Sequence, residues 1–173
     1  MKKFITLAIT AISTLGLLNS CVYDRGSDTT IVNNVVLPIH EVKADFSVND
    51  KHLFNINPVM HSTDKLLVYR LWGKTDNNRD IWRMVPNSVY FNNGEILSYN
   101  YDFTVADINL FIEANFNVDT FSNFDKEKYL RNQYFRIVEL PAGTASKAPI
   151  DYNDYDQVIE FYGLKDAPVI KNY

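Results

Sequence analysis

The chain has 173 residues, a length that suits one domain because single domains commonly run about 100–200 residues. Hydrophobic residues make up 46% and charged residues 22%, a composition that excludes an intrinsically disordered chain. The formal net charge of -4 argues against a nucleic-acid-binding protein that works through a basic face. The single cysteine excludes an intrachain disulfide and a multi-cysteine zinc site.

Residues 1–20 have the features of a secretory signal peptide. Lys2 and Lys3 form a positive amino-terminal region, and residues 4–18 form a mostly apolar segment. This segment is shorter than the roughly 20 apolar residues that cross a bilayer as a helix. The pattern therefore predicts a segment that directs export and is then removed.

The end of this segment resembles a bacterial lipobox. In Leu18-Asn19-Ser20-Cys21, an aliphatic residue and two small or polar residues precede the cysteine. The resemblance implies a diacylglyceryl thioether on Cys21, cleavage before it, and acylation of the new amino terminus with a chain such as palmitate. More than one acyl chain gives lasting membrane attachment. The alternative is an ordinary signal peptide followed by an incidental cysteine.

The predicted boundaries are a lipoprotein signal peptide over 1–20, the lipidated Cys21 with a short tether over 21–30, and one domain over 31–173. Residues 22–30 are polar without a regular period, as in a tether. Cleavage removes Lys2 and Lys3, so the formal charge becomes -6. Val22 occupies the position where Asp acts as an inner-membrane retention signal, which favours the outer membrane of a Gram-negative envelope.

Alternation of apolar and polar residues predicts strands through the first half of the domain. Residues 42–48 place all their apolar side chains on one face, as a half-buried strand does. Residues 53–57 predict a short strand that Pro58 ends. Residues 66–72 are almost continuously apolar, β-branched or aromatic, which predicts a central strand covered on both faces.

Strand signals continue after a turn-rich segment. The further predicted strands are 81–85, 88–91, 96–103, 107–113 and 133–140. Asn93-Gly94 predicts a tight primed turn between two of them, because both residues tolerate positive φ. Two short helices are predicted, a marginal one over 123–131 and a clearer one over 153–162, with Asn153 as its cap and Gly163 beyond its end.

These elements together predict an all-β fold. About seven to nine mostly antiparallel strands, without a β-α-β rhythm, indicate a β-sandwich or a partly open barrel. One or two short helices accompany the strands, and the clearer one lies near the carboxyl terminus. A mature domain of this length can bury a sizeable core without disulfides.

The order of several motifs is similar to that of a known group. The segments are 67–71 (LVYRL), 80–86 (DIWRMVP), 99–104 (YNYDFT) and 135–142 (FRIVELPA). Together they resemble a group of Bacteroidetes lipoproteins to which no activity is assigned. The resemblance covers somewhat under half of the chain and implies a β-rich extracytoplasmic domain. This chain lacks the collagen-like Gly-Pro run that many of those relatives carry after the lipid-bearing cysteine.

The sequence gives little support for a catalytic site or a metal-binding site. The sequence has no Gly-x-Ser-x-Gly motif, and His40, His52 and His61 lie in or beside predicted turns without metal-ligand spacing. Asp76, Asn78 and Asp80 place oxygen ligands at alternate positions, as a calcium loop does. The Gly and Glu that an EF-hand requires later in the loop are missing, so turn chemistry explains the same residues. No cofactor is predicted.

Aromatic residues suggest two interpretations. Tyr99 and Tyr101 share one face of a predicted strand, and Trp72 and Trp82 flank the turn at Asp76, where they could approach each other across a hairpin. Rings two residues apart are usually core or cross-strand pairs. On an exposed face, the same four rings would form a platform that stacks on a sugar or a peptide.

Three arginines are set within apolar strands: Arg70, Arg83 and Arg136. They are expected either on outer faces of the sheets or paired with carboxylates such as Asp102. A paired arginine could orient a ligand, or it could serve only to fix the strand register.

The sequence therefore predicts a non-enzymatic, outer-membrane-anchored lipoprotein that acts in binding, adhesion or as an accessory module of the envelope. Its expected partners are the membrane, through Cys21, and a glycan, a peptide or an envelope protein, but no nucleic acid. One alternative is a hydrolase acting on envelope or dietary polymers, which requires two carboxylates in a concave pocket. Another is a structural subunit, which requires a large flat apolar patch.

Overall fold

A computed structural model of the chain describes residues 38–47, 52–55, 64–140 and 149–173. The chain divides into two compact units, Met1–Thr30 and Ile31–Tyr173, and every described residue belongs to the second. Cys21 and the predicted signal peptide and tether thus lie outside the described residues. Within the described part, no helix is both long and apolar enough to cross a membrane.

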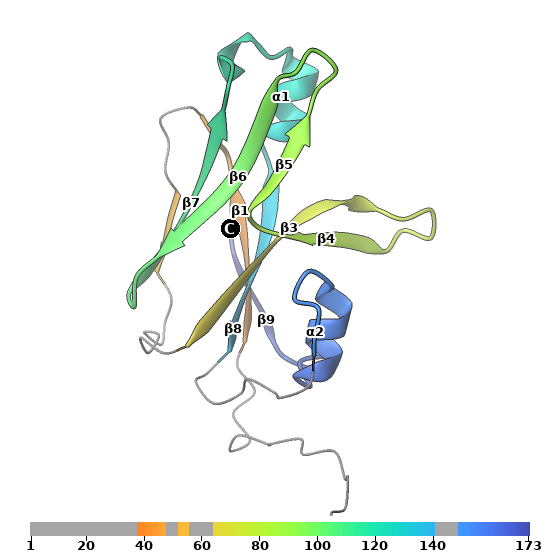
Figure 1. Cartoon of the computed structure of the whole chain (residues 1–173). Helices are drawn as coiled ribbons and strands as arrows, with labels where there is room; N and C mark the ends of the chain where they lie inside the picture. Colours follow the sequence, from red (N-terminus) through yellow and green to blue (C-terminus); the bar gives the residue numbers. More distant parts are fainter. Residues whose placement is uncertain (1–37, 48–51, 56–63, 141–148) are drawn as a thin grey trace, which may run out of the picture. The chain divides into compact units, whose positions relative to one another are not determined.

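The described residues form two β-sheets, as predicted for a sandwich (Figure 1). Sheet A has the strand order β4 (Asp80–Met84), β3 (Lys65–Lys74), β8 (Gln133–Leu140), β1 (Ile39–Ala44), β9 (Val169–Asn172). Sheet B has the order β2 (His52–Asn55), β7 (Asp107–Ala114), β6 (Ile96–Phe103), β5 (Asn87–Tyr90). All neighbouring strands are antiparallel except β1 and β9, which run parallel.

Three short helical elements join these strands: the 3-10 turn η1 (Val118–Thr120), α1 (Asn123–Tyr129) and α2 (Tyr155–Phe161). The Ser122 hydroxyl accepts the Asp125 N–H and caps α1. The cap of α2 is Asp154, which accepts the Gln157 N–H at 3.0 Å, so the prediction of Asn153 was wrong by one residue. The Asn153 N–H instead donates to the Asp151 carboxylate, which holds Asn153 in the preceding turn.

The main core lies between the two sheets. Side chains at alternate positions of β1, β3 and β8 meet those of β6 and β7, as period-two alternation requires. Phe46 is buried in this core and makes edge-to-face contacts to Tyr99 and Phe135. The core members with no exposed surface are Val68, Val85, Leu97, Tyr99, Ile108, Leu110, Val118 and Phe135.

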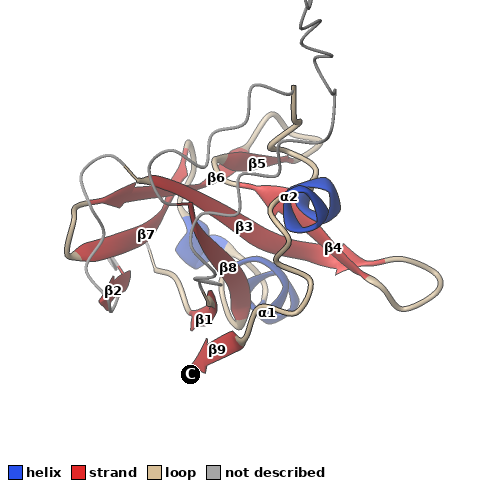
Figure 2. Cartoon of the chain, turned by 90° about the horizontal axis from the view of Figure 1, so that it is seen from below, coloured by secondary structure: helices blue, strands red, loops and turns tan. Residues whose placement is uncertain are grey.

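A second cluster covers the opposite face of sheet A. Figures 1 and 2 both place α2 beside the β3–β4 hairpin, and Tyr155 and Val158 of α2 pack on Tyr69 and Val138 of the sheet. Because the two faces of β3 are covered by different clusters, its residues from Leu66 to Arg70 are all buried. The prediction that this strand is central and covered on both faces is confirmed.

The β5–β6 hairpin differs in detail from its prediction. Its loop has three residues, Asn92-Asn93-Gly94, because the Phe91 N–H donates to Glu95 O and the Gly94 N–H donates to Phe91 O. Only Gly94 has positive φ, +83°, whereas the predicted two-residue primed turn requires it at Asn93 as well. The observed loop, which ends in a left-handed glycine, matches the common three-residue hairpin loop.

Candidate ligand-binding cleft

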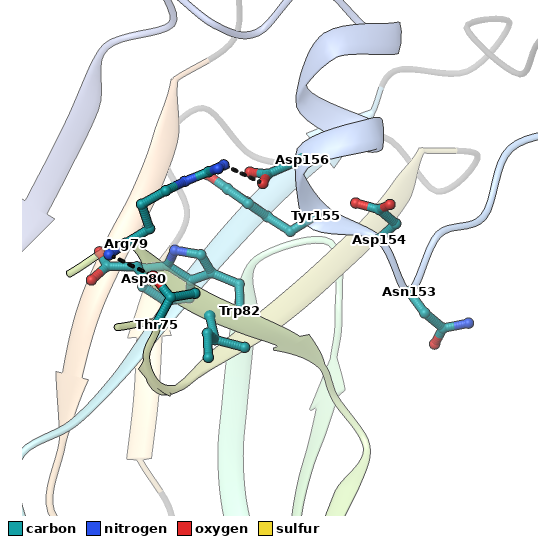
Figure 3. Close-up of a pocket in the computed structure, with 9 residues that line it drawn as sticks. Thr75, Arg79, Asp80, Trp82, Asn153, Asp154, Tyr155 and Asp156 are labelled. Atoms are coloured by element: carbon teal, nitrogen blue, oxygen red, sulfur yellow. Dashed lines mark hydrogen bonds and ion pairs between the residues drawn. The ribbon is translucent and has the colours of Figure 1, made fainter. Parts of the chain in front are cut away.

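A cleft of about 310 Å³ opens between the tip of the β3–β4 hairpin and the first turn of α2 (Figure 3). The hairpin approaches the cleft from one side and the start of α2 from the other. The residues that line it are Thr75, Arg79, Asp80, Ile81, Trp82, Asn153, Asp154, Tyr155 and Asp156.

The hairpin side is shaped by a compact turn. The Thr75 N–H donates to Arg79 O at 2.8 Å, and the Asn78 N–H donates to Thr75 O at 2.9 Å. Asn78 takes the left-handed conformation, φ 60°, that asparagine tolerates better than most residues. The Arg79 N–H donates to the Thr75 hydroxyl, which fixes the rim of the cleft.

The floor of the cleft is aromatic and is supported by a partly buried ion pair. The Trp82 and Tyr155 rings are 5.8 Å apart, and both residues are more than nine-tenths buried. The Arg136 guanidinium lies 4.2 Å from the Trp82 ring centroid and donates to the Tyr155 hydroxyl at 2.9 Å. Arg136 also donates to Glu41 at 3.0 Å. Because other groups cover these rings, the floor offers a ligand little ring surface for stacking.

Tyr155 in this floor and Tyr69 beside it keep their hydroxyls neutral. Burial raises the pKa of Tyr155, although Arg136 opposes that effect. Burial also raises the pKa of Tyr69 well above its ordinary value, and the neighbouring Tyr155 adds to the rise. Tyr69 donates its hydroxyl proton to Tyr152 O at 2.7 Å, a bond that joins the sheet to the segment leading into α2. These hydroxyls therefore act as hydrogen-bonding groups rather than as acids at neutral pH.

The three carboxylates of the cleft each have a protein partner. Asp80 accepts from Lys74 at 2.7 Å, and Asp154 caps α2. Arg79 and Asp156 meet across the mouth of the cleft at 3.3 Å, as Figure 3 shows. The side chains of this last pair are 75% and 76% exposed, so the pair is worth at most about 1 kcal/mol and a ligand can replace it.

The structure separates the four rings for which an exposed platform was one of the two interpretations. Trp82 is buried in the cluster on the outer face of sheet A, whereas Tyr99 of sheet B lies wholly within the main core between the sheets. Tyr101 is half-buried and stacks on Phe103, with ring centroids 6.1 Å apart. Trp72 is half-buried on the face opposite to Trp82, so the two do not meet across the hairpin. The four rings therefore do not form one exposed platform.

A shift in strand register explains why the tryptophans separate. Leu71 is opposite Trp82, but the next partners are Gly73 and Ile81, so Trp72 is the extra residue of a bulge. A bulge of this kind re-aims the side chains that follow it. The sequence carries no clear signal for the bulge other than Gly73.

The weak calcium candidates do not converge. Asp80 is paired with Lys74, and Asn78 belongs to the hairpin turn beside Asp76. Among the described side chains, no group of three or more His, Cys, Asp or Glu could hold a metal ion.

Two of the histidines lie in strands rather than turns. His40 is within β1, where burial lowers its pKa, and His52 begins β2. His61 is outside the described residues. The prediction placed these residues in or beside turns, whereas His40 is the second residue of β1 and His52 is at the boundary where β2 begins.

Two of the arginines agree with the expected alternatives. Arg83 is exposed, and Arg136 pairs with a carboxylate, which is Glu41 rather than Asp102 because β1 and not β6 is its neighbour in the sheet. Sequence reasoning missed Arg79, Tyr155 and Asp156 as cleft residues. Their juxtaposition depends on how α2 docks on the sheet, and the only available signal was the apolar face of the predicted helix.

Comparison with protein-family models, curated proteins and solved structures found no match to this chain.

Proposed function

We propose that the protein is a lipid-anchored extracytoplasmic binding protein. The anchor is Cys21, and residues 1–20 are its signal peptide. The support is the position of the single cysteine directly after an apolar segment of signal-peptide length. The mature chain would lie on the outer membrane, with residues 21–30 as its tether. The order of the motifs at 67–71, 80–86, 99–104 and 135–142, which resembles that of a group of Bacteroidetes lipoproteins, supports an extracytoplasmic domain.

The anchor is tested by replacing its sulfur. Cys21→Ser should abolish palmitate labelling and leave the chain as an unprocessed precursor, and globomycin should cause the wild-type precursor to accumulate. Ser20→Ala is the matched control, because alanine is also a small residue and leaves the thiol in place. Palmitate incorporation into the Cys21→Ser chain would contradict the assignment.

We propose further that the cleft binds a neutral carbohydrate. The single observation that supports this is its lining, in which hydroxyl, carboxylate and guanidinium groups surround a small apolar floor. Carboxylates accept hydrogen bonds from sugar hydroxyls, and a guanidinium donates to them. The Arg79–Asp156 pair would open on binding, and both groups would then contact the ligand.

Binding is favoured over hydrolysis by the state of the carboxylates. Glycoside hydrolysis needs one acid to protonate the leaving group and one to act as base or nucleophile. Asp80, Asp154 and Asp156 all have protein partners, and Asp154 is committed to the cap of α2. The hydrolase remains the alternative function, and its signature would be new reducing ends.

The test is calorimetric titration of the purified chain with a panel of neutral oligosaccharides. Asp156→Asn and Arg79→Gln should each weaken binding about tenfold or more, the loss expected for one hydrogen bond to a charged group. Glu127→Gln is the control, because Glu127 of α1 forms an exposed pair with Arg131 and does not line the cleft. Binding that is unchanged in both cleft variants, or absent for the whole panel, would reject the proposal. Release of reducing ends would favour the hydrolase.

A further inference from the structure

Two arginines face each other on the side of the β3–β4 hairpin that faces away from the cleft. Arg70 of β3 and Arg83 of β4 are cross-strand partners, and Trp72 contacts both. The Arg83 guanidinium lies 3.7 Å from the Trp72 ring centroid, and that of Arg70 lies 5.6 Å from it. Arg70 also lies 3.8 Å from the ring centroid of Tyr99, so the hairpin meets the main core here.

Arg70 is buried, with 4% of its surface exposed. Its Nε and Nη2 atoms donate to the Gln133 side-chain oxygen. The Gln133 amide nitrogen donates to Lys128 O and Arg131 O, which fixes the oxygen toward Arg70. The remaining Nη1 atom is buried and has no partner among the residues that the structure describes.

The partner of Arg70 is thus a neutral amide rather than a carboxylate. In the described part of the chain neither Arg70 nor Arg83 forms an ion pair, whereas Arg79, Arg131 and Arg136 each do. Burial lowers the pKa of Arg70, and the nearby Arg83 charge adds to this effect. Arginine nevertheless stays charged in proteins.

An uncompensated buried charge is unfavourable, and buried charges are normally paired. Here two positive charges are adjacent in a chain whose net charge is -4. The burial of the side chains increases from Arg83, which is exposed, through Trp72, which is half-buried, to Arg70, which is buried. An anion that approached from solvent would meet Arg83 first and would reach Arg70 when the Trp72 side chain turned aside.

We propose that Arg70 and Arg83 form a binding site for an oxyanion group, with Trp72 as its movable cover. Guanidinium forks bind carboxylate, phosphate and sulfate oxygens through charge-assisted hydrogen bonds. The anion would accept from Nη1 of Arg70 and from the guanidinium of Arg83. This site lies on the opposite face of the hairpin from the carbohydrate cleft and does not depend on it.

Tryptophan fluorescence provides the direct test. The chain has two tryptophans, and Trp82 lies on the other face of sheet A. Titration at low salt with acetate, inorganic phosphate or sulfate should give a saturable change, and the anion that binds best identifies the ligand class. Trp72→Phe should abolish this signal while calorimetry still detects binding.

Two variants localise the site. Arg83→Gln removes an exposed side chain and should weaken binding about tenfold or more without unfolding the chain, as expected for a lost charge-assisted hydrogen bond. Arg131→Gln is the control, because that arginine is also exposed but lies on the segment after α1. Bound anion should also raise the melting temperature, since a ligand that binds only the native state stabilises it.

The outcomes separate this site from the cleft. Asp156→Asn should leave anion binding unchanged, and Arg83→Gln should leave carbohydrate binding unchanged.

Arg70→Met tests the buried arginine. A variant that gained stability while the wild-type chain bound none of the three anions would show that Arg70 is an uncompensated core residue only. Equal binding by wild type and Arg83→Gln would also overturn the proposal.

Discussion

Glu41 and Arg136 are direct cross-strand partners on β1 and β8, and their side chains meet at 3.0 Å. The same row of the sheet continues to Tyr69 on one side and to Lys171 on the other. Lys171 lies 3.9 Å from Glu41, so the carboxylate has two cations beside it. This row fixes the register of four strands under the aromatic floor of the cleft.

Loss of Arg136 should therefore destabilise the protein. Arg136→Met removes the closest partner of Glu41, whose side chain is 9% exposed, and leaves it the longer contacts with Lys171 at 3.9 Å and the Tyr173 hydroxyl at 3.4 Å. The expected loss is about 2–3 kcal/mol, below the largest values for broken buried pairs because Arg136 is 21% exposed. Urea unfolding measures it. Arg131→Met, which breaks an exposed pair with Glu127, should change stability by less than about 0.5 kcal/mol.

Stability should fall at alkaline pH because of buried tyrosines such as Tyr99. Burial raises its pKa to about 12 from the ordinary value of 10.0, although Arg70 opposes the rise. The unfolded tyrosine ionises above pH 10.0 while the folded one stays neutral, so its contribution is complete below pH 10.0 and is lost toward pH 12. Urea midpoints measured across this window should decline.

Tyr99→Phe separates this effect from general alkaline damage. The variant loses the hydrogen bond that the hydroxyl donates to Tyr129 O at 2.6 Å, which is worth about 1 kcal/mol. Its decline between pH 10.0 and 12 should be shallower than that of the wild type. Parallel declines would show that Tyr99 does not contribute.

The β5–β6 loop depends on one glycine. Gly94 has φ +83°, where a Cβ atom is disfavoured, so Gly94→Ala should cost about 1 kcal/mol. Gly73→Ala is the matched control, because Gly73 lacks a positive φ and has no atom within 4 Å of an added Cβ. If both variants have equal unfolding free energies, the left-handed geometry at Gly94 is not required.

The cap of α2 gives a prediction that distinguishes two adjacent residues. Asp154→Ala should cost about 1 kcal/mol, because the Gln157 N–H loses its acceptor. Asn153→Ala should cost much less, since the backbone N–H of residue 153 keeps its bond to Asp151. Thermal melts of the two variants measure the difference. A larger loss for Asn153→Ala would favour the cap expected from sequence.

Much of the fold follows from patterns of side chains along the chain. The predicted strands over 96–103 and 133–140 match β6 and β8 residue for residue, because both are rich in β-branched and aromatic residues, and Gly94 and Pro141 mark clear boundaries. β9 was not predicted. It has four exposed residues without alternation, and only its pairing with β1 makes it a strand.

The candidate sites were less accessible to sequence reasoning than the fold. The bulge at Trp72 reverses the expected relation of the two tryptophans, and no local signal specifies it. Arg70 was expected on an outer face or beside a carboxylate, but its alternation with Leu66 and Val68 places it toward the main core. The amide and the ring that it meets there belong to Gln133 of β8 and Tyr99 of β6, far away in the sequence, and local patterns do not specify such contacts.

The position of β1 has a consequence for how the chain matures. Its two neighbours in sheet A, β8 and β9, both come from the last quarter of the sequence. A ribosome delivers the amino-terminal strand first, so this strand must wait without partners until almost the whole polypeptide has emerged. Assembly of sheet A is therefore an event that follows synthesis, and a prematurely terminated product would expose both edges of its first strand to neighbouring chains.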